Sequence, residues 1–172
     1  MTTEHTFAPY VRALGKGKRG SRSLTQAEAR DAMAMILQQQ VEPEQLGAFL
    51  MLLRLKEETP QELAGFVEAV RAHHHYSPAL VAGIQVDLDW STYAGKKRHL
   101  PWFLLAALTL AGQGIKVFMH GAKGHTKGRI YSQDVLSALG MPIAQNWQQC
   151  QTQLQDRNFS FMSLQQLSPA LD

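Results

Sequence analysis

One stretch of the sequence, Val86 to Asp134, constrains the fold more strongly than any other. It begins with a short buried-strand pattern at Val86–Leu88 and continues into an apolar helical segment, Leu100–Ala111. A second strand is expected at Ile115–Met119, and a further helix starts near Ser132. Because strands that alternate with helices form parallel sheets, this order predicts an α/β domain.

The two loops that follow these strands, Trp90–Arg98 and His120–Arg129, are basic. From Trp90 to Gln133 the sequence holds seven lysines and arginines and no acidic residue. Both loops are expected at the edge where the parallel strands end, which is the usual ligand side of an open sheet. We therefore predict that this edge binds an anionic ligand.

The first part of the chain predicts a small all-helical domain. Phe7–Leu14 is a short amphipathic helix, and Thr25 with Glu28 forms a capping box at the start of the next one. A turn before Pro43 starts a third helix, and Thr59-Pro60-Gln61-Glu62 is a strong start signal for a fourth. The apolar faces of the last three helices are expected to be Ala29, Ala32, Met33, Ile36 and Leu37; Leu46, Phe49, Leu50, Leu52 and Leu53; and Leu63, Phe66, Val67 and Val70. Gly47 is the expected point of close helix approach.

The sequence after the central stretch adds only one more strand, Phe159–Met162. About three strands are few for a sheet of this type. We therefore expect the chain to be part of a longer protein. The predicted organisation is a helical domain over residues 1–76, followed by the first, incomplete part of a parallel-sheet α/β domain over residues 77–172.

Charge is segregated along the chain more than its formal net charge of +3 implies. Twelve of the 17 lysines and arginines lie in two windows, Arg12–Arg22 and Lys96–Arg129. Such segregation favours an anionic partner. The single cysteine, Cys150, excludes an internal disulfide. Because the longest apolar run is too short for a bilayer and the N-terminus lacks a signal-peptide pattern, we expect a cytoplasmic protein without a membrane partner.

Two local motifs allow alternative interpretations. The glycine-rich basic loop Gly15–Ser23 is either a solvated connector or a phosphate contact, and it lacks the order of a P-loop. The run His73-His74-His75 points in three helical directions, so we expect a helix C-terminus there and predict no metal site.

Several motifs together resemble the glycosyltransferase family 3 fold, which anthranilate phosphoribosyltransferase and the class II pyrimidine nucleoside phosphorylases share. They are LTQAEARDAM and TPQELAGFVEAVRAH in the helical part, then VFMHGAK and QDVLSALGMPI. The resemblance covers about residues 10–170. It implies a nucleoside phosphorylase/phosphoribosyltransferase-like architecture and a homodimer formed through the helical domain.

The sequence departs from that family at the loops that hold its substrates. The family's Gly-Thr-Gly-Gly-Asp loop corresponds to Trp90–Arg98, in which only Gly95 remains and the aspartate is absent. Its His-Gly-Asn motif corresponds to His120-Gly121-Ala122, and its serine-rich phosphate loop to Lys123–Arg129. The acidic pair that binds magnesium in the family would lie beyond residue 172. The pattern Ser91, Gly95, Arg98 and Pro101 is similar to the YbiB-type branch of the fold, which implies a nucleic-acid-binding relative.

The first hypothesis is therefore sequence-independent binding of nucleic acid, DNA or RNA, by a phosphoribosyltransferase-like scaffold. Its predicted phosphate contacts come from three loops. They are Lys16, Lys18, Arg19, Arg22, Ser91, Gly95, Lys96, Lys97, Arg98, His120, Gly121, Lys123, Lys127 and Arg129. No cofactor is required for this function.

Two further hypotheses remain open. One is a phosphoribosyltransferase with an altered substrate, in which His120 and Lys123 would handle acceptor and phosphate and magnesium would be needed. The other is an interaction module whose helical part docks a partner. The sequence decides neither whether the protein is an enzyme nor which residues would be catalytic.

Overall fold

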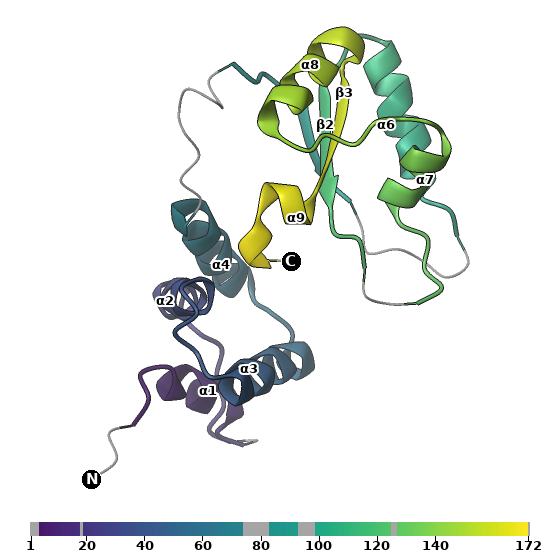
Figure 1. Cartoon of the computed structure of the whole chain (residues 1–172). Helices are drawn as coiled ribbons and strands as arrows, with labels where there is room; N and C mark the ends of the chain where they lie inside the picture. The colour runs from purple at the N-terminus through teal and green to yellow at the C-terminus, as the bar shows by residue number, and fades with distance from the viewer. Residues whose placement is uncertain (1–3, 18, 74–82, 93–98, 125–126, 172) are drawn as a thin grey trace. The chain divides into compact units, whose positions relative to one another are not determined.

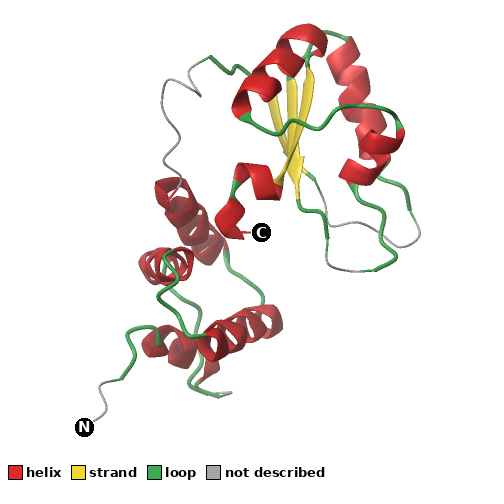
Figure 2. Cartoon of the chain, viewed as in Figure 1, coloured by secondary structure: helices red, strands yellow, loops and turns green. Residues whose placement is uncertain are grey.

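The computed structural model describes residues 4–17, 19–73, 83–92, 99–124 and 127–171. The chain divides into two compact units, Met1–His75 and Tyr76–Asp172 (Figure 1). The first unit is helical and the second is built on a parallel sheet (Figure 2). This is the expected fold class, a helical bundle followed by an α/β part.

The first unit consists of helices α1 (Ala8–Gly15), α2 (Gln26–Leu37), α3 (Pro43–Lys56) and α4 (Pro60–His73). The capping box predicted for α2 is present, because the Thr25 side chain accepts from the Glu28 backbone and Glu28 accepts from the Thr25 backbone. Prolines stand in the first turn of α3 and begin α4, where a missing N–H costs nothing. The local start signals in the sequence therefore determine where α2, α3 and α4 begin.

An aromatic contact forms the centre of the helical core. The rings of Phe7 and Phe49 lie 5.2 Å apart, and both side chains are buried. Leu14 and Leu24 join them, together with Leu53. The core thus ties the N-terminal segment and α1 to α3 and to the turn that precedes α2.

Part of the apolar pattern expected for α3 and α4 is wrong. Leu50, Leu63 and Val67 are about half exposed, although the sequence pattern placed them on packed faces. The face that α4 buries instead carries Glu62, Gly65 and Ala69. For Leu63 and Val67 of α4 the reason is the close crossing of α2 and α4 at Gly65, which leaves no room for a larger side chain.

The residue that permits this crossing is Gly65 and not Gly47. A β-carbon at Gly65 would overlap the carbonyl oxygen of Gln26 and lie 2.8 Å from the backbone nitrogen of Arg30. At Gly47 a β-carbon would meet nothing within 4 Å. The expectation for Gly47 is therefore corrected.

The second unit contains a sheet of three parallel strands in the order β1–β2–β3. The strands are β1 (Leu88–Ser91), β2 (Val117–Gly121) and β3 (Phe159–Ser163). Among the described residues, the other elements of this unit are α6 (Phe103–Gly112), α7 (Ser132–Ala138), α8 (Trp147–Arg157), α9 (Leu164–Leu167) and the 3₁₀ turn η1 (Pro169–Leu171).

Helices cover both faces of this sheet (Figure 1). On one face, α6 and α7 pack Leu104, Ala107 and Leu136 onto side chains that include Met119 and Phe161. On the other face, α8 packs Cys150 and Leu154 onto Phe118 and Met162. The result is a three-layer arrangement in which alternate side chains of β2 and β3 enter different cores.

Both predicted strands of the central stretch begin two residues too early. The structure places them at Leu88–Ser91 and Val117–Gly121, where the expectations were Val86–Leu88 and Ile115–Met119. The physical reason lies in Asp87, whose carboxylate accepts from the backbone N–H of Lys116 at 2.8 Å. A side chain thus binds the backbone immediately before the point where β1 and β2 begin to pair. Ser91, His120 and Gly121 consequently lie in strand ends and not in loops.

Among the residues that the structure describes, no helix is both long enough and apolar enough to cross a membrane.

Candidate functional site

The carboxyl ends of β1 and β2 form the edge at which the sequence predicted a ligand site. Ser91 lies opposite His120 in the strand register, and the backbone N–H of Thr92 donates to the His120 carbonyl at 2.7 Å. A β-carbon at Gly121 would overlap the Thr92 hydroxyl. The two strand ends therefore approach closely because position 121 is glycine.

His120 is held on the α8 face of the sheet by two neighbours. Its Nε2 lies 3.1 Å from Oδ1 of Asp89, which is one diagonal step away on β1. Its ring lies 5.6 Å from that of Phe118, with 33° between the planes. The His120 side chain is 22% exposed and the Asp89 side chain 65% exposed. The imidazole is thus fixed at the rim of the site and faces a carboxylate.

The loop after β2 carries a second carboxylate contact. Nζ of Lys123 lies 3.6 Å from Oδ1 of Asp134 in the first turn of α7. Gly124 packs against the phenol of Tyr131, where a β-carbon would overlap the ring, and Tyr131 is buried. The path of this loop therefore depends on a glycine and on a buried tyrosine that the sequence reasoning did not single out.

Lys127 and Arg129 are exposed in the same loop. Within the described ranges, neither forms an ion pair. Among the cations that the structure describes at this edge, these two could contact a phosphate directly.

The acid-free window of the sequence is bounded by the two aspartates that fold back onto it. Asp89 precedes the window and contacts His120, and Asp134 follows it and contacts Lys123. The prediction of a uniformly basic edge is therefore too simple. Sequence order alone placed these acids outside the site. The pairing of β1 with β2 brings Asp89 to His120, and the fold of the chain into α7 brings Asp134 to Lys123.

In the first unit, one predicted phosphate contact already has a carboxylate partner. The guanidinium of Arg22 donates two hydrogen bonds of 2.6 Å to Glu28. The Arg22 guanidinium, together with the Thr25 backbone N–H, lowers the pKa of Glu28 to about 2. Lys16 and Arg19 are exposed and form no ion pair within the described part of this unit.

The remaining predicted contacts are Lys18, Gly95, Lys96, Lys97 and Arg98, which lie outside the described residues. The likeness to the YbiB-type branch uses Gly95 and Arg98, and it stays a prediction for the same reason. A joint binding surface made by the cations of both units also stays a prediction.

The described residues do not form a magnesium site at this edge. They contain no cluster of three histidine, cysteine, aspartate or glutamate side chains placed to hold a metal ion. The two carboxylates present, Asp89 and Asp134, each contact a basic side chain. These residues therefore do not fit a metal-bound pyrophosphate by themselves.

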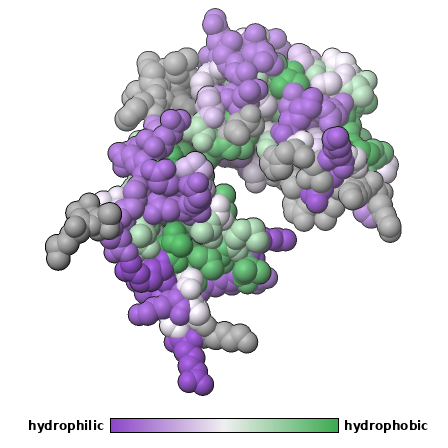
Figure 3. All heavy atoms as spheres, turned by 60° about the horizontal axis from the view of Figure 1, so that its bottom comes forward, coloured by the Kyte–Doolittle hydropathy of each residue, from purple (hydrophilic) through white to green (hydrophobic). Residues whose placement is uncertain are grey.

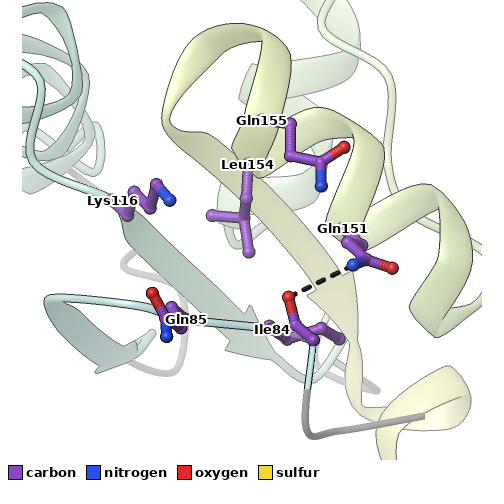
Figure 4. Close-up of a pocket in the computed structure, with 7 residues that line it drawn as sticks. Ile84, Gln85, Lys116, Gln151, Leu154 and Gln155 are labelled. Carbon is purple, nitrogen blue, oxygen red and sulfur yellow. Dashed lines mark hydrogen bonds between the residues drawn. The ribbon is translucent and has the colours of Figure 1, made fainter.

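A small pocket of about 140 Å³ lies near the amino ends of the strands, away from the predicted edge (Figure 4). Three glutamine side chains, Lys116 and two aliphatic side chains line it. Nε2 of Gln151 donates to the Gly83 carbonyl at 3.1 Å, which is the bond drawn in the figure. No sequence motif indicated this pocket, because its lining residues come from three separate segments. They are Gly83, Ile84, Gln85, Lys116, Gln151, Leu154 and Gln155.

Comparison with known proteins identifies the family to which this architecture is similar. Residues 8–74 match the family described as "Glycosyl transferase family, helical bundle domain". Anthranilate phosphoribosyltransferase of Methylocella silvestris is 36% identical over 154 residues, which are 88% of this chain and 42% of the relative. The enzyme of the same name from Gluconobacter oxydans is 33% identical over 171 residues, which are 99% of this chain and 45% of the relative.

Solved structures agree on the fold. Anthranilate phosphoribosyltransferase (TrpD) from Thermus thermophilus superposes with a TM-score of 0.65 at 21% sequence identity. The match covers 94% of this chain and 49% of that one. The Saccharomyces cerevisiae anthranilate phosphoribosyltransferase, in complex with PRPP and Mg, gives a TM-score of 0.58 at 18% identity and covers 98% and 51% of the two chains.

A helical bundle that leads into a parallel sheet is thus the fold that this chain shares with solved anthranilate phosphoribosyltransferases. The chain belongs to glycosyltransferase family 3, and its relatives given above carry the name anthranilate phosphoribosyltransferase. It spans less than half the length of those curated relatives.

Proposed function

We propose that the chain binds a phosphorylated ribose at the carboxyl edge of β1 and β2, as part of a phosphoribosyltransferase-type protein. The observation that carries this proposal is the edge itself. His120 and Gly121 end β2 beside Thr92, and the loop that follows presents Lys127 and Arg129 to solvent. The relatives named for a phosphoribosyl transfer support the same ligand class.

The described side chains can divide this task. Lys127 and Arg129 offer charge to a phosphate, because no carboxylate among the described residues pairs with them. His120 stands at a rim position, where a ribose hydroxyl rather than a phosphate would meet it. This separation of charged and neutral contacts is typical of sites that orient a sugar phosphate.

Nucleic-acid binding is the second candidate function. The exposed cations Lys16 and Arg19 in one unit and Lys127 and Arg129 in the other favour it, because each could contact a backbone phosphate. Arg22 and Lys123 contribute less than expected, since both contact carboxylates. No named relative supports this function.

The proposed partner is a second copy of the chain, bound through the helical unit. The family resemblance implies this homodimer, and exposed apolar side chains on α3 support it. Met51 and Leu55, one helical turn apart, are 59% and 77% exposed. Figure 3 shows apolar atoms gathered on the surface of this unit.

One pair of titrations tests the two candidate functions. Calorimetry with phosphoribosyl pyrophosphate and with ribose 5-phosphate, with and without magnesium, measures sugar-phosphate binding. Fluorescence anisotropy of a labelled single-stranded oligonucleotide, at several salt concentrations, measures nucleic-acid binding. We expect saturable binding of the sugar phosphates and a loss of about tenfold in the double variant Lys127→Ala/Arg129→Ala, because two solvent-screened charge contacts contribute up to about 1 kcal/mol each.

The outcomes separate the candidates. Oligonucleotide binding with a steep salt dependence, a slope of about −3 for four phosphate contacts, without sugar-phosphate binding, would support the second candidate and overturn the first. Lack of binding to either ligand would overturn both.

A further inference from the structure

The pair formed by Asp89 and His120 determines which hydrogen-bonding groups the proposed site can accept. A carboxylate has acceptor atoms only, so the ring nitrogen that faces it carries the proton. That nitrogen is Nε2, at 3.1 Å from Oδ1 of Asp89. In a neutral imidazole the other nitrogen, Nδ1, is then left as an acceptor.

The surroundings of His120 limit the other arrangements of the ring. Phe118 lies two residues earlier on the same strand face, and its ring lies 5.6 Å from the imidazole. On the other side, Met162 of β3 stands opposite His120 in the register and is buried. The ring is therefore enclosed by apolar neighbours and by one carboxylate, and is open to solvent only over the 22% that remains exposed.

We infer that Asp89 is a positioning residue, which holds His120 in the tautomer that accepts a hydrogen bond through Nδ1. His120 then selects a ligand group that donates, such as a ribose hydroxyl, and is not a phosphate contact. The charge of Asp89 adds to this selection, because a carboxylate behind the imidazole repels a phosphate brought to the same place. This inference rests on the proposed function for its ligand class.

The inference changes the role of one predicted site residue. His120 was expected among the phosphate contacts, together with the lysines and arginines. In the structure its partner is an acid, whereas Lys127 and Arg129 form no ion pair in the described part of the chain. The edge thus has a neutral accepting position at the strand end and cationic positions in the following loop.

Nitrogen-15 NMR of the full chain tests the tautomer without any ligand. At pH 8 we expect the His120 signals, assigned by their absence in His120→Gln, to show a protonated Nε2 and an unprotonated Nδ1. In Asp89→Ala the two tautomers should become mixed, and in Asp89→Asn the Nε2–H form should persist, because the amide oxygen still accepts. Asp134→Ala, which removes the other carboxylate of this edge, should leave the His120 signals unchanged.

Ligand binding tests the selection. Ribose 5-phosphate carries sugar hydroxyl groups that inorganic pyrophosphate lacks, so their affinities can be compared in the same variants. We expect Asp89→Ala to weaken ribose 5-phosphate about two- to tenfold, the range of one neutral hydrogen bond, and to leave pyrophosphate equal or tighter. Asp89→Asn should restore most of the affinity for ribose 5-phosphate.

Two results would overturn the inference. One is a protonated Nδ1 in the unmodified chain, and the other is an equal effect of Asp89→Ala on both ligands. If the unmodified chain does not bind ribose 5-phosphate, the proposed function fails, while the NMR signals still decide whether Asp89 positions His120.

Discussion

At the scale of single residues, two glutamates organise the helical unit through backbone donors. Glu62 is fully buried, and its carboxylate accepts from the backbone N–H of Leu24 at 2.7 Å and of Thr59 at 2.8 Å. The Thr59 hydroxyl donates to it as well. The start signal of α4 is thus also a bond to the segment before α2, 38 residues earlier.

The pKa of Glu62 gives this contact a pH dependence. Burial alone would raise that pKa, but the N–H groups of Thr59 and Leu24 lower it by more, to below its usual 4.5. A lowered folded-state pKa means that the stabilisation is complete above pH 4.5 and is lost as the pH falls through the folded-state value. The stabilisation by Glu28, whose pKa is lowered to about 2, is likewise lost as the pH falls.

The first prediction concerns Glu62→Gln. The amide keeps one acceptor oxygen, so it turns an NH₂ group toward the donor of either Leu24 or Thr59, and it removes the charge. We expect the helical unit to lose about 1.5–3 kcal/mol at pH 7, the range for hydrogen bonds to a charged group. Native-state hydrogen exchange of the α2 and α4 amides measures this loss unit by unit.

The control for this prediction is Glu58→Gln, since Glu58 is exposed four residues earlier. It should change the protection by less than about 0.5 kcal/mol. The difference between the two variants should shrink as the pH falls below 4.5 toward the lowered pKa of the folded-state Glu62 carboxylate. Equal protection of the two variants at pH 7 would show that the buried carboxylate does not stabilise the unit.

At the scale of elements, glycine positions decide how closely neighbouring segments approach. Gly65 sets the crossing of α2 and α4, and Gly121 sets the approach of the β1 and β2 ends. Helix periodicity in the sequence predicted that α2 and α4 exist. It did not predict which glycine lies in the contact, because Gly47 and Gly65 occur in similar apolar surroundings.

The second prediction compares Gly65→Ala with Gly47→Ala. The added methyl group at position 65 would lie 2.9 Å from Cβ of Ala29 and would overlap the Gln26 carbonyl, so the helices must separate. We expect a loss of about 1–3 kcal/mol, as for other overpacked sites. The same change at position 47 meets no atom within 4 Å and should stabilise the unit by about 0.5–1 kcal/mol through helix propensity.

Thermal unfolding followed by far-ultraviolet circular dichroism measures both variants on the same helical signal. The opposite signs make each variant the control of the other. If both alanines stabilise the chain, the α2–α4 crossing has room that the structure does not show.

At the scale of the whole chain, the sequence predicted the architecture and missed contacts between distant residues. The capping box of α2, the proline starts of α3 and α4, and the three parallel strands are local patterns, and all of them are confirmed. The strand boundaries were two residues early, because apolar residues at the strand entry resemble the strand itself. The pairing of Asp89 with His120 joins positions 31 residues apart, which no local pattern shows.

The candidate site was predictable to the same extent. Its place at the carboxyl edge of parallel strands followed from the order of elements. Its charge did not, because two acids at the borders of the basic window, Asp89 and Asp134, contact basic side chains of the site. These contacts reduce the positive charge of the edge. The class of ligand that we propose is therefore narrower than any polyanion, and it has separate phosphate and hydroxyl groups.

The last prediction tests the proposed homodimer through Leu55→Glu. This side chain is 77% exposed on α3 and contributes little to the core, so the variant should fold. If a second copy covers α3, the buried charge should convert the dimer into a monomer, because an unpaired carboxylate inside an apolar interface costs several kcal/mol. Size-exclusion chromatography with light scattering, over a range of protein concentrations, gives the mass directly. Leu139→Glu is the matched control, since it adds the same charge at a 59% exposed leucine of the second unit and should leave the dimer intact. A monomeric unmodified chain at every concentration would show that residues 1–172 do not form the proposed dimer, and dissociation by both variants would move the interface away from α3.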